Sequence, residues 1–157
     1  MARRLAKFSR LSFLDQRLLM RAALAVVSAK LAIRTLSLPA ARAAVMRLER
    51  LGWLERLGRI VVPVRADRIV WAVETAGGAI PGMKNCLVQA VAAEAMLIRA
   101  GHPCELRIGA AKNGPRELIA HAWLESEGRV LIGDFELDRY VPLIARQLQS
   151  SAPPAQR

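Results

Sequence analysis

The hydrophobic period of the chain changes near Gly101, and this change decides the fold class. Before Gly101 apolar residues recur at the 3.6-residue period of helices, and after it they alternate or run over strand lengths. Helices are therefore followed by three antiparallel strands, an order typical of an α+β domain in which a helix packs on a small sheet. The 157 residues, 54% of them hydrophobic, suffice for one folded domain and exclude a disordered chain.

Three or four helices are predicted up to Gly101, from four candidate segments. The longest, residues 13–36, follows Ser12 and includes Asp15, a pair that resembles a capping box, and it contains neither glycine nor proline. Three more follow, each with residues that would begin or end it: residues 39–57, ended by Gly58; residues 68–76, capped by Asp67 and ended by Gly77 and Gly78; and residues 86–100, followed by Gly101. Cys86 therefore opens a helix.

Three strands are predicted after Gly101: residues 104–108, 118–125 and 129–135. A two-residue turn at 127–128 would place residues whose numbers sum to 255 opposite each other. This register pairs His121 with Asp134 on one face of the sheet. A bulge would move Asp134 off its partner and leave Glu136 or Asp138 as the acidic neighbour.

These residues can form a catalytic triad. An aspartate opposite His121 can accept a hydrogen bond from one ring nitrogen, so that the other nitrogen can take a proton from a nucleophile. Cys86 could be that nucleophile, because unsatisfied N–H groups and the dipole at a helix start stabilise a thiolate. The alternatives are that Cys86 is a small buried residue and that His121 and Asp134 form a surface pair with no nucleophile near.

A metal or nucleotide site has less support. His102 and Cys104 could join Cys86 and His121 around zinc, but the spacing lacks the paired cysteines of structural zinc sites. Cys104 is expected in the core of a strand. The chain contains no glycine-rich phosphate-binding motif. We therefore expect neither a metal nor a cofactor.

Cysteine content and hydropathy predict a cytoplasmic protein without a transmembrane segment. Two cysteines are too few for a disulfide framework and fit a reducing compartment. No uninterrupted apolar region of a signal peptide follows the basic N-terminus. The longest uncharged stretch of the most apolar region, residues 22–29, is far shorter than the ~20 residues of a spanning helix.

The net charge of +11 comes entirely from the first 70 residues. They contain 15 Lys/Arg and 4 Asp/Glu, whereas the remaining residues contain 9 of each. A solvated basic face is the default interpretation. The alternatives are attraction to an acidic protein or peptide, and contact with an anionic membrane or nucleic acid.

Two strings carry a resemblance to a known family. Asn85-Cys86-Leu87 opens an alanine-rich helix, and residues 120–125 read A-H-A-W-L-E in a strand that follows. With the strand at 106–109, these strings resemble the transglutaminase-like leader peptidases of lasso peptide biosynthesis, over residues 60–134. The resemblance implies a papain-like core in which a cysteine-bearing helix packs on a small antiparallel sheet. It also implies that Cys86 is the nucleophile, His121 the general base and Asp134 the acidic third member.

The family's members remove the leader from a ribosomally made precursor peptide. This cleavage frees the α-amine of the core peptide, the part of the precursor that remains. An ATP-dependent cyclase then joins this amine to an Asp or Glu side chain. In some members a leader-recognition domain precedes the peptidase, but residues 1–70 here read as helices without the strands of that domain. We therefore expect a separate leader-recognition protein, no cofactor and no bound nucleic acid.

The implied organisation has three parts: a basic helical region over residues 1–59 that packs on the core, the peptidase core over residues 60–148, and a flexible tail over residues 149–157. The helix at 13–36 has two apolar arcs, one with Leu14, Leu18, Val26 and Ile33, and one with Leu24, Val27 and Leu31. We expect one arc to face the peptidase and the other, rimmed by Arg17, Arg21 and Arg34, to face the recognition partner.

An oxyanion hole is needed as well. The Cys86 backbone N–H is one natural donor, and the side chain of Gln89 or Asn85 could supply a second.

Two other functions fit parts of the sequence. One is a basic binding module for nucleic acid or a membrane surface, with Cys86 as filler, and the other is an acyl transferase on the same scaffold.

Overall fold

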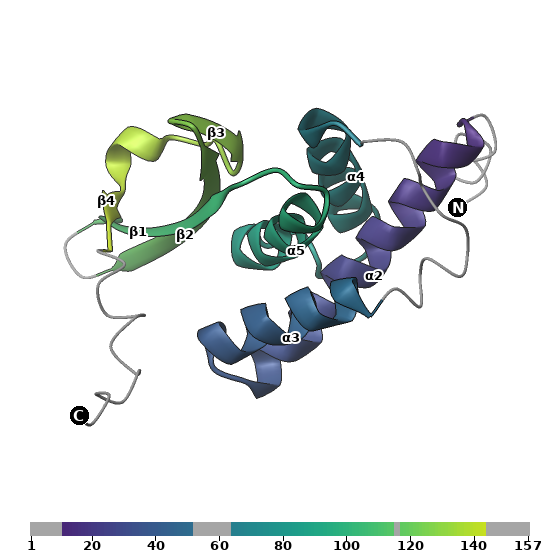
Figure 1. Cartoon of the computed structure of the whole chain (residues 1–157). Coiled ribbons are helices and arrows are strands. Elements are labelled where there is room, and N and C mark those ends of the chain that lie inside the picture. The colour runs from purple at the N-terminus through teal and green to yellow at the C-terminus, as the bar shows by residue number, and fades with distance from the viewer. Residues whose placement is uncertain (1–10, 52–63, 115–116, 144–157) are drawn as a thin grey trace, which may run out of the picture.

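The computed structural model describes residues 11–51, 64–114 and 117–143, which form a helical layer beside a small sheet (Figure 1). The elements follow one another along the chain as four helices, three strands, a 3₁₀ turn and a last short strand: α2 (Phe13–Thr35), α3 (Leu38–Arg50), α4 (Ala66–Ala79), α5 (Cys86–Arg99), β1 (Glu105–Lys112), β2 (Leu118–Ser126), β3 (Arg129–Ile132), η2 (Leu137–Arg139) and β4 (Val141–Pro142). The predicted α+β class is confirmed.

Helix α2 begins as predicted. The Ser12 side chain accepts a hydrogen bond from the Asp15 N–H at 3.2 Å. The helix lies on the side of the helical layer away from the sheet and packs against α3, α4 and α5 (Figure 1). Leu18 and Val26 of the first predicted arc are buried, whereas Leu31 of the second arc is exposed. No helix in the described ranges is long and apolar enough to cross a membrane.

Two ion pairs fix α3 to its neighbours. Arg21 on α2 donates through Nε to Glu49 Oε2 at 2.8 Å, and Arg42 on α3 donates through Nε to Glu94 Oε2 on α5 at 2.8 Å. Both carboxylates are buried, with at most 4% of either side chain exposed. A buried carboxylate needs a positive charge beside it, and Arg21 supplies that charge to Glu49. Arg21 therefore stabilises the fold, whereas the sequence predicted that it would contact a partner protein.

The predicted bounds of two helices are wrong. Helix α3 ends at Arg50 instead of Leu57, and Gly58 lies outside the described residues. Gly77 and Gly78 lie inside α4 instead of ending it, and Asp67 does not cap the helix, because the N-cap is Arg65. Gly77 is small for a packing reason: a Cβ there would lie 2.3 Å from Nε2 of Gln89 on α5. This glycine allows α4 and α5 to approach closely.

Helix α5 confirms the prediction for the cysteine-bearing helix. Asn85 caps it, since Oδ1 accepts from the N–H groups of Leu87 and Val88 at 3.0 and 3.2 Å. At the other end Gly101 adopts a left-handed φ of +85°, and the His102 N–H reaches back to the Leu97 carbonyl at 2.9 Å. Residues 88–97 of this helix are mostly buried, so α5 is the central helix of the core.

The sheet has the order β3-β2-β1-β4 with antiparallel neighbours. Three strands were expected, and the fourth, β4, has only two residues. The turn at 127–128 does have two residues, and Ser126 pairs with Arg129 as predicted. An irregularity then shifts the register, so Leu124 faces Ile132 instead of Leu131. The predicted opposition of His121 and Asp134 is therefore wrong.

Candidate active site

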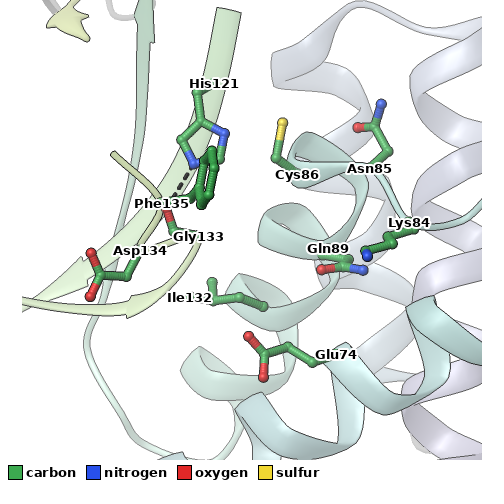
Figure 2. A pocket seen from close by; sticks show the side chains of 10 residues that line it. All are labelled: Glu74, Lys84, Asn85, Cys86, Gln89, His121, Ile132, Gly133, Asp134 and Phe135. Carbon is green, nitrogen blue, oxygen red and sulfur yellow. Dashed lines mark hydrogen bonds between the residues drawn. The ribbon is translucent and has the colours of Figure 1, made fainter. Parts of the chain in front are cut away.

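A pocket of about 340 Å³ lies where the start of α5 meets the end of β3 and one face of α4 (Figure 2). It brings together five residues singled out in the sequence: Asn85, Cys86, Gln89, His121 and Asp134. The other lining residues were not foreseen, and they are Glu74, Lys84, Ile132, Gly133 and Phe135. The pocket thus joins chain segments from both sides of the change in hydrophobic period.

Cys86 is the first residue of α5 and is half-buried at the pocket wall. The Asn85 cap uses the N–H groups of Leu87 and Val88, which leaves the Cys86 N–H outside the cap. Figure 2 shows the Cys86 sulfur across from the imidazole of His121, and both residues line the pocket. A sulfur in this position lies at the positive end of the helix dipole, where negative charge is stabilised.

His121 comes from β2 and is oriented by the main chain. Its Nε2 lies 2.7 Å from the carbonyl oxygen of Gly133. A carbonyl can only accept, so Nε2 must carry the hydrogen, and Nδ1 of the neutral ring keeps its lone pair. Nδ1 is the nitrogen that faces Cys86 (Figure 2). The ring is therefore held as a base toward the thiol.

Gly133 can occupy this position because it has no side chain. Its φ is +84°, and a Cβ would meet the Ala122 carbonyl oxygen at 2.8 Å and the Trp123 Cβ at 3.0 Å. The left-handed backbone follows directly after β3 ends at Ile132. We infer that this glycine turns the chain so that its carbonyl points at His121.

None of the three acidic candidates is the hydrogen-bond acceptor of His121 Nε2, which is the Gly133 carbonyl. Asp134 lines the pocket but is exposed, and Figure 2 shows its carboxylate turned away from His121. Glu136 forms an ion pair with Arg139, and Asp138 lies in the 3₁₀ turn η2, so neither lines this pocket. The physical reason has two parts: the irregularity offsets the β2–β3 partners by one residue, and β3 ends at Ile132, so residue 134 lies beyond the pairing.

Two aromatic rings hold the imidazole. The ring of Trp123 stacks with that of His121 at 6.1 Å between centroids, and the ring of Tyr140 lies at 5.1 Å, tilted by 34°. Gly109 pairs with His121 across β1 and β2, and a Cβ there would lie 2.9 Å from the Tyr140 Cβ. Tyr140 and Gly109 were not predicted from the sequence to belong to this site. The glycine inside a strand was the one signal that could have indicated a close approach.

The second cysteine has a different environment. Cys104 is half-buried, and burial, together with the nearby charge of Glu94, raises the pKa of its thiol to about 11. His102 contacts the Val64 carbonyl oxygen through Nε2 at 2.7 Å. Among the described residues, no three His, Cys, Asp or Glu side chains are grouped as a metal site.

Selective alkylation should separate the two thiols. Iodoacetamide at pH 8 is expected to label Cys86 and to leave Cys104 unlabelled, because only thiolates react and Cys104 stays protonated until the pH approaches 11. Mass spectrometry of tryptic peptides gives the site. Labelling that persists in Cys86→Ala at pH 8, or that is lost in Cys104→Ala, would contradict this assignment.

A helix-borne cysteine that faces a sheet-borne histidine defines the class of scaffold on which acyl groups are transferred to and from a thiol. A match of residues 4–145 to the transglutaminase-like superfamily shows that the chain belongs to that superfamily, which contains cysteine proteases and acyltransferases. The match covers the N-terminal helices as well as the sheet. Neither the curated proteins nor the solved structures contain a match to this chain.

Proposed function

We propose that the protein is a cysteine peptidase that removes the leader from a lasso peptide precursor. The observation that carries the proposal is the orientation of His121: Nε2 is held by the Gly133 carbonyl at 2.7 Å, and Nδ1 faces the Cys86 thiol. The resemblance of the Asn85-Cys86-Leu87 and A-H-A-W-L-E strings to leader peptidases supplies the substrate class.

The proposed reaction has two steps. In the first step His121 Nδ1 takes the Cys86 proton, and the sulfur attacks the scissile carbonyl. The C–N bond then breaks, and the imidazolium gives its proton to the leaving amine of the core peptide. In the second step His121 removes a proton from water, which attacks the thioester carbonyl. The C–S bond breaks, the sulfur recovers a proton from His121, and the leader leaves with a free carboxylate.

Two donors and one carboxylate complete the proposed machinery. The Cys86 N–H and an amide of Gln89 or Asn85 would bind the oxyanion. The Asn85 amide oxygen is already used by the helix cap, so only its NH₂ group is available for this role. Asp134 enters the proposal as a pocket carboxylate that stabilises the imidazolium by its charge, since the hydrogen-bond acceptor is Gly133.

The proposal includes partners and a compartment. The precursor would be presented by a separate leader-recognition protein, and an ATP-dependent cyclase would use the freed amine. Arg17 and Arg34 on α2 remain in the proposal as partner-binding residues, whereas Arg21 is engaged with Glu49. We place the reaction in the cytoplasm, where a reducing medium keeps the free thiol of Cys86 active.

Mass spectrometry of the products tests the activity. A precursor peptide is incubated with its recognition protein and with the wild type, Cys86→Ala or Cys104→Ala, in the presence of a primary amine. We expect a single cleavage that releases the leader with a free carboxylate. This product should be absent with Cys86→Ala and present with Cys104→Ala. A leader that carries the added amine would indicate acyl transfer, and no cleavage by the wild type with the leader bound would contradict the proposal.

The role of Gln89 can be tested through Gly77. Because a Cβ at Gly77 would lie 2.3 Å from the Gln89 Nε2, Gly77→Ala should displace this amide and lower kcat for leader cleavage about tenfold to a hundredfold. Gly78→Ala is the matched control, since its Cβ meets nothing within 4 Å. It should leave kcat unchanged and stabilise α4 by up to about 1 kcal/mol. Equal kcat values for the two variants would remove Gln89 from the proposed machinery.

A further inference from the structure

The outer face of α2 carries a row of exposed apolar side chains. Phe13, Met20, Leu24 and Leu31 are 68%, 54%, 37% and 60% exposed, although the opposite face of the same helix is fully packed against the core. A helix at the surface of a soluble domain normally presents polar residues on its outer side. This helix is therefore apolar on both sides.

The row has the spacing of a coiled-coil seam. Its members alternate steps of four and three residues over three repeats, at positions 13, 17, 20, 24, 27, 31 and 34. At 100° per residue the first six positions fall within about 80° of the helix circumference. A narrow seam of this kind fits the a and d positions of a coiled coil formed with one partner helix.

Charge distinguishes between possible partner helices. The two cations within the row are Arg17 and Arg34, and both carboxylates of α2 and α3 are already used, Asp15 by Arg68 and Glu49 by Arg21. A second copy of this chain would bring arginines against arginines, and neither α2 nor α3 has a spare carboxylate to compensate. An incoming helix with acidic side chains beside its apolar seam would instead complete the charge pattern.

We propose that the face of α2 formed by residues 13, 17, 20, 24, 27, 31 and 34 binds an acidic amphipathic helix of another protein. Apolar side chains of the partner pack on Met20, Leu24 and Leu31, and its carboxylates meet Arg17 and Arg34. None of these residues lines the pocket. The inference therefore rests on the partner binding proposed above for Arg17 and Arg34 and names the chemistry of that partner, and its test does not require the peptidase activity.

A designed peptide provides the probe. A labelled three-heptad peptide with Leu at a and d and Glu at e and g is titrated with the full-length protein, and fluorescence anisotropy gives Kd. A second peptide with Lys in place of Glu tests the charge requirement. We expect the acidic peptide to bind and the basic peptide to bind at least tenfold more weakly.

Three variants locate the surface. Met20→Ser/Leu31→Ser should raise Kd for the acidic peptide at least tenfold, and Arg17→Glu/Arg34→Glu should reverse the preference in favour of the basic peptide. Leu118→Ser is the matched control, because Leu118 is 73% exposed but lies on β2 of the sheet. It should leave Kd unchanged. Circular dichroism verifies that each variant is folded.

Other occupants of this face would overturn the proposal in recognisable ways. Binding to phosphatidylglycerol vesicles without binding to the acidic peptide, lost in Met20→Ser/Leu31→Ser, would indicate a membrane surface. A wild-type dimer in sedimentation equilibrium that the same variant converts to a monomer would indicate a second copy of the chain. Equal Kd values for the wild type and all variants would show that the peptide binds elsewhere. Leader cleavage, assayed separately, can fail without affecting any of these outcomes.

Discussion

Gly133→Ala should lower kcat for leader cleavage by about a thousandfold in a protein that still folds, because misorienting a catalytic histidine costs on the order of 10³ to 10⁴ in rate. The added Cβ would lie 2.8 Å from the Ala122 carbonyl oxygen, so the loop must move and its own carbonyl must leave His121 Nε2. Without that acceptor the ring can adopt the other tautomer, in which Nδ1 is protonated and cannot take the Cys86 proton. Single-turnover cleavage of the presented precursor measures kcat.

Gly128→Ala is the matched control for this experiment. Gly128 has a similar left-handed φ of +76°, but its Cβ would meet nothing within 4 Å. Both variants should lose about 1 kcal/mol of stability from backbone strain, and only Gly133→Ala should lose activity. Asp134→Asn should change kcat less than about tenfold, because Asp134 acts only through its charge. A normal kcat for Gly133→Ala beside a large loss for Asp134→Asn would return the orienting role to Asp134.

Arg42→Met should destabilise the fold by about 3 to 5 kcal/mol, because it leaves the Glu94 carboxylate buried without its partner. Only 2% of the Glu94 side chain is exposed, and Arg42 binds it with both Nε and Nη2. The carboxylate in turn raises the pKa of Arg42, so the guanidinium is charged at all ordinary pH values. Urea denaturation, followed by circular dichroism, measures the free energy of unfolding.

Two comparisons test whether burial of Glu94 is the reason for the large loss of stability expected in Arg42→Met. Arg65→Met breaks an ion pair with Asp67 in which both side chains are mostly exposed, so it should cost less than about 1 kcal/mol. Arg42→Met/Glu94→Met removes both charges and should recover most of the lost stability, since apolar replacements of buried ion pairs are often neutral. A double variant as unstable as Arg42→Met alone would contradict this explanation.

The elements with a strong local signal could be predicted from the sequence. The Asn85 cap, the length of α5 and the glycine at 101 are all local features, and the strands follow from alternation. The end of α4 was misplaced because Gly77 is required by close packing against Gln89, 12 residues away, and does not end the helix. Strand β4 was missed because two residues carry no periodicity.

The candidate site shows the same division. Cys86 and His121 could be placed because a helix start and a strand fix where their side chains point. The acceptor for His121 could not, because a single irregularity in the β2–β3 pairing changes every later partner, and the pattern of residue types does not reveal it. The acceptor is also a main-chain carbonyl, a group that every residue has, so side-chain chemistry gives no sign of it.

The orienting group of this histidine cannot be deleted by truncating a side chain. An alanine scan of the pocket would remove the Asp134 carboxylate and measure its effect on activity. It would not remove the carbonyl of residue 133, because every residue that replaces the glycine has one. The requirement falls instead on shape: residue 133 must be small enough to pass beneath Ala122 and Trp123. In a sequence alignment this role would be visible as an invariant glycine beside a more variable acid, a pattern easily attributed to a turn.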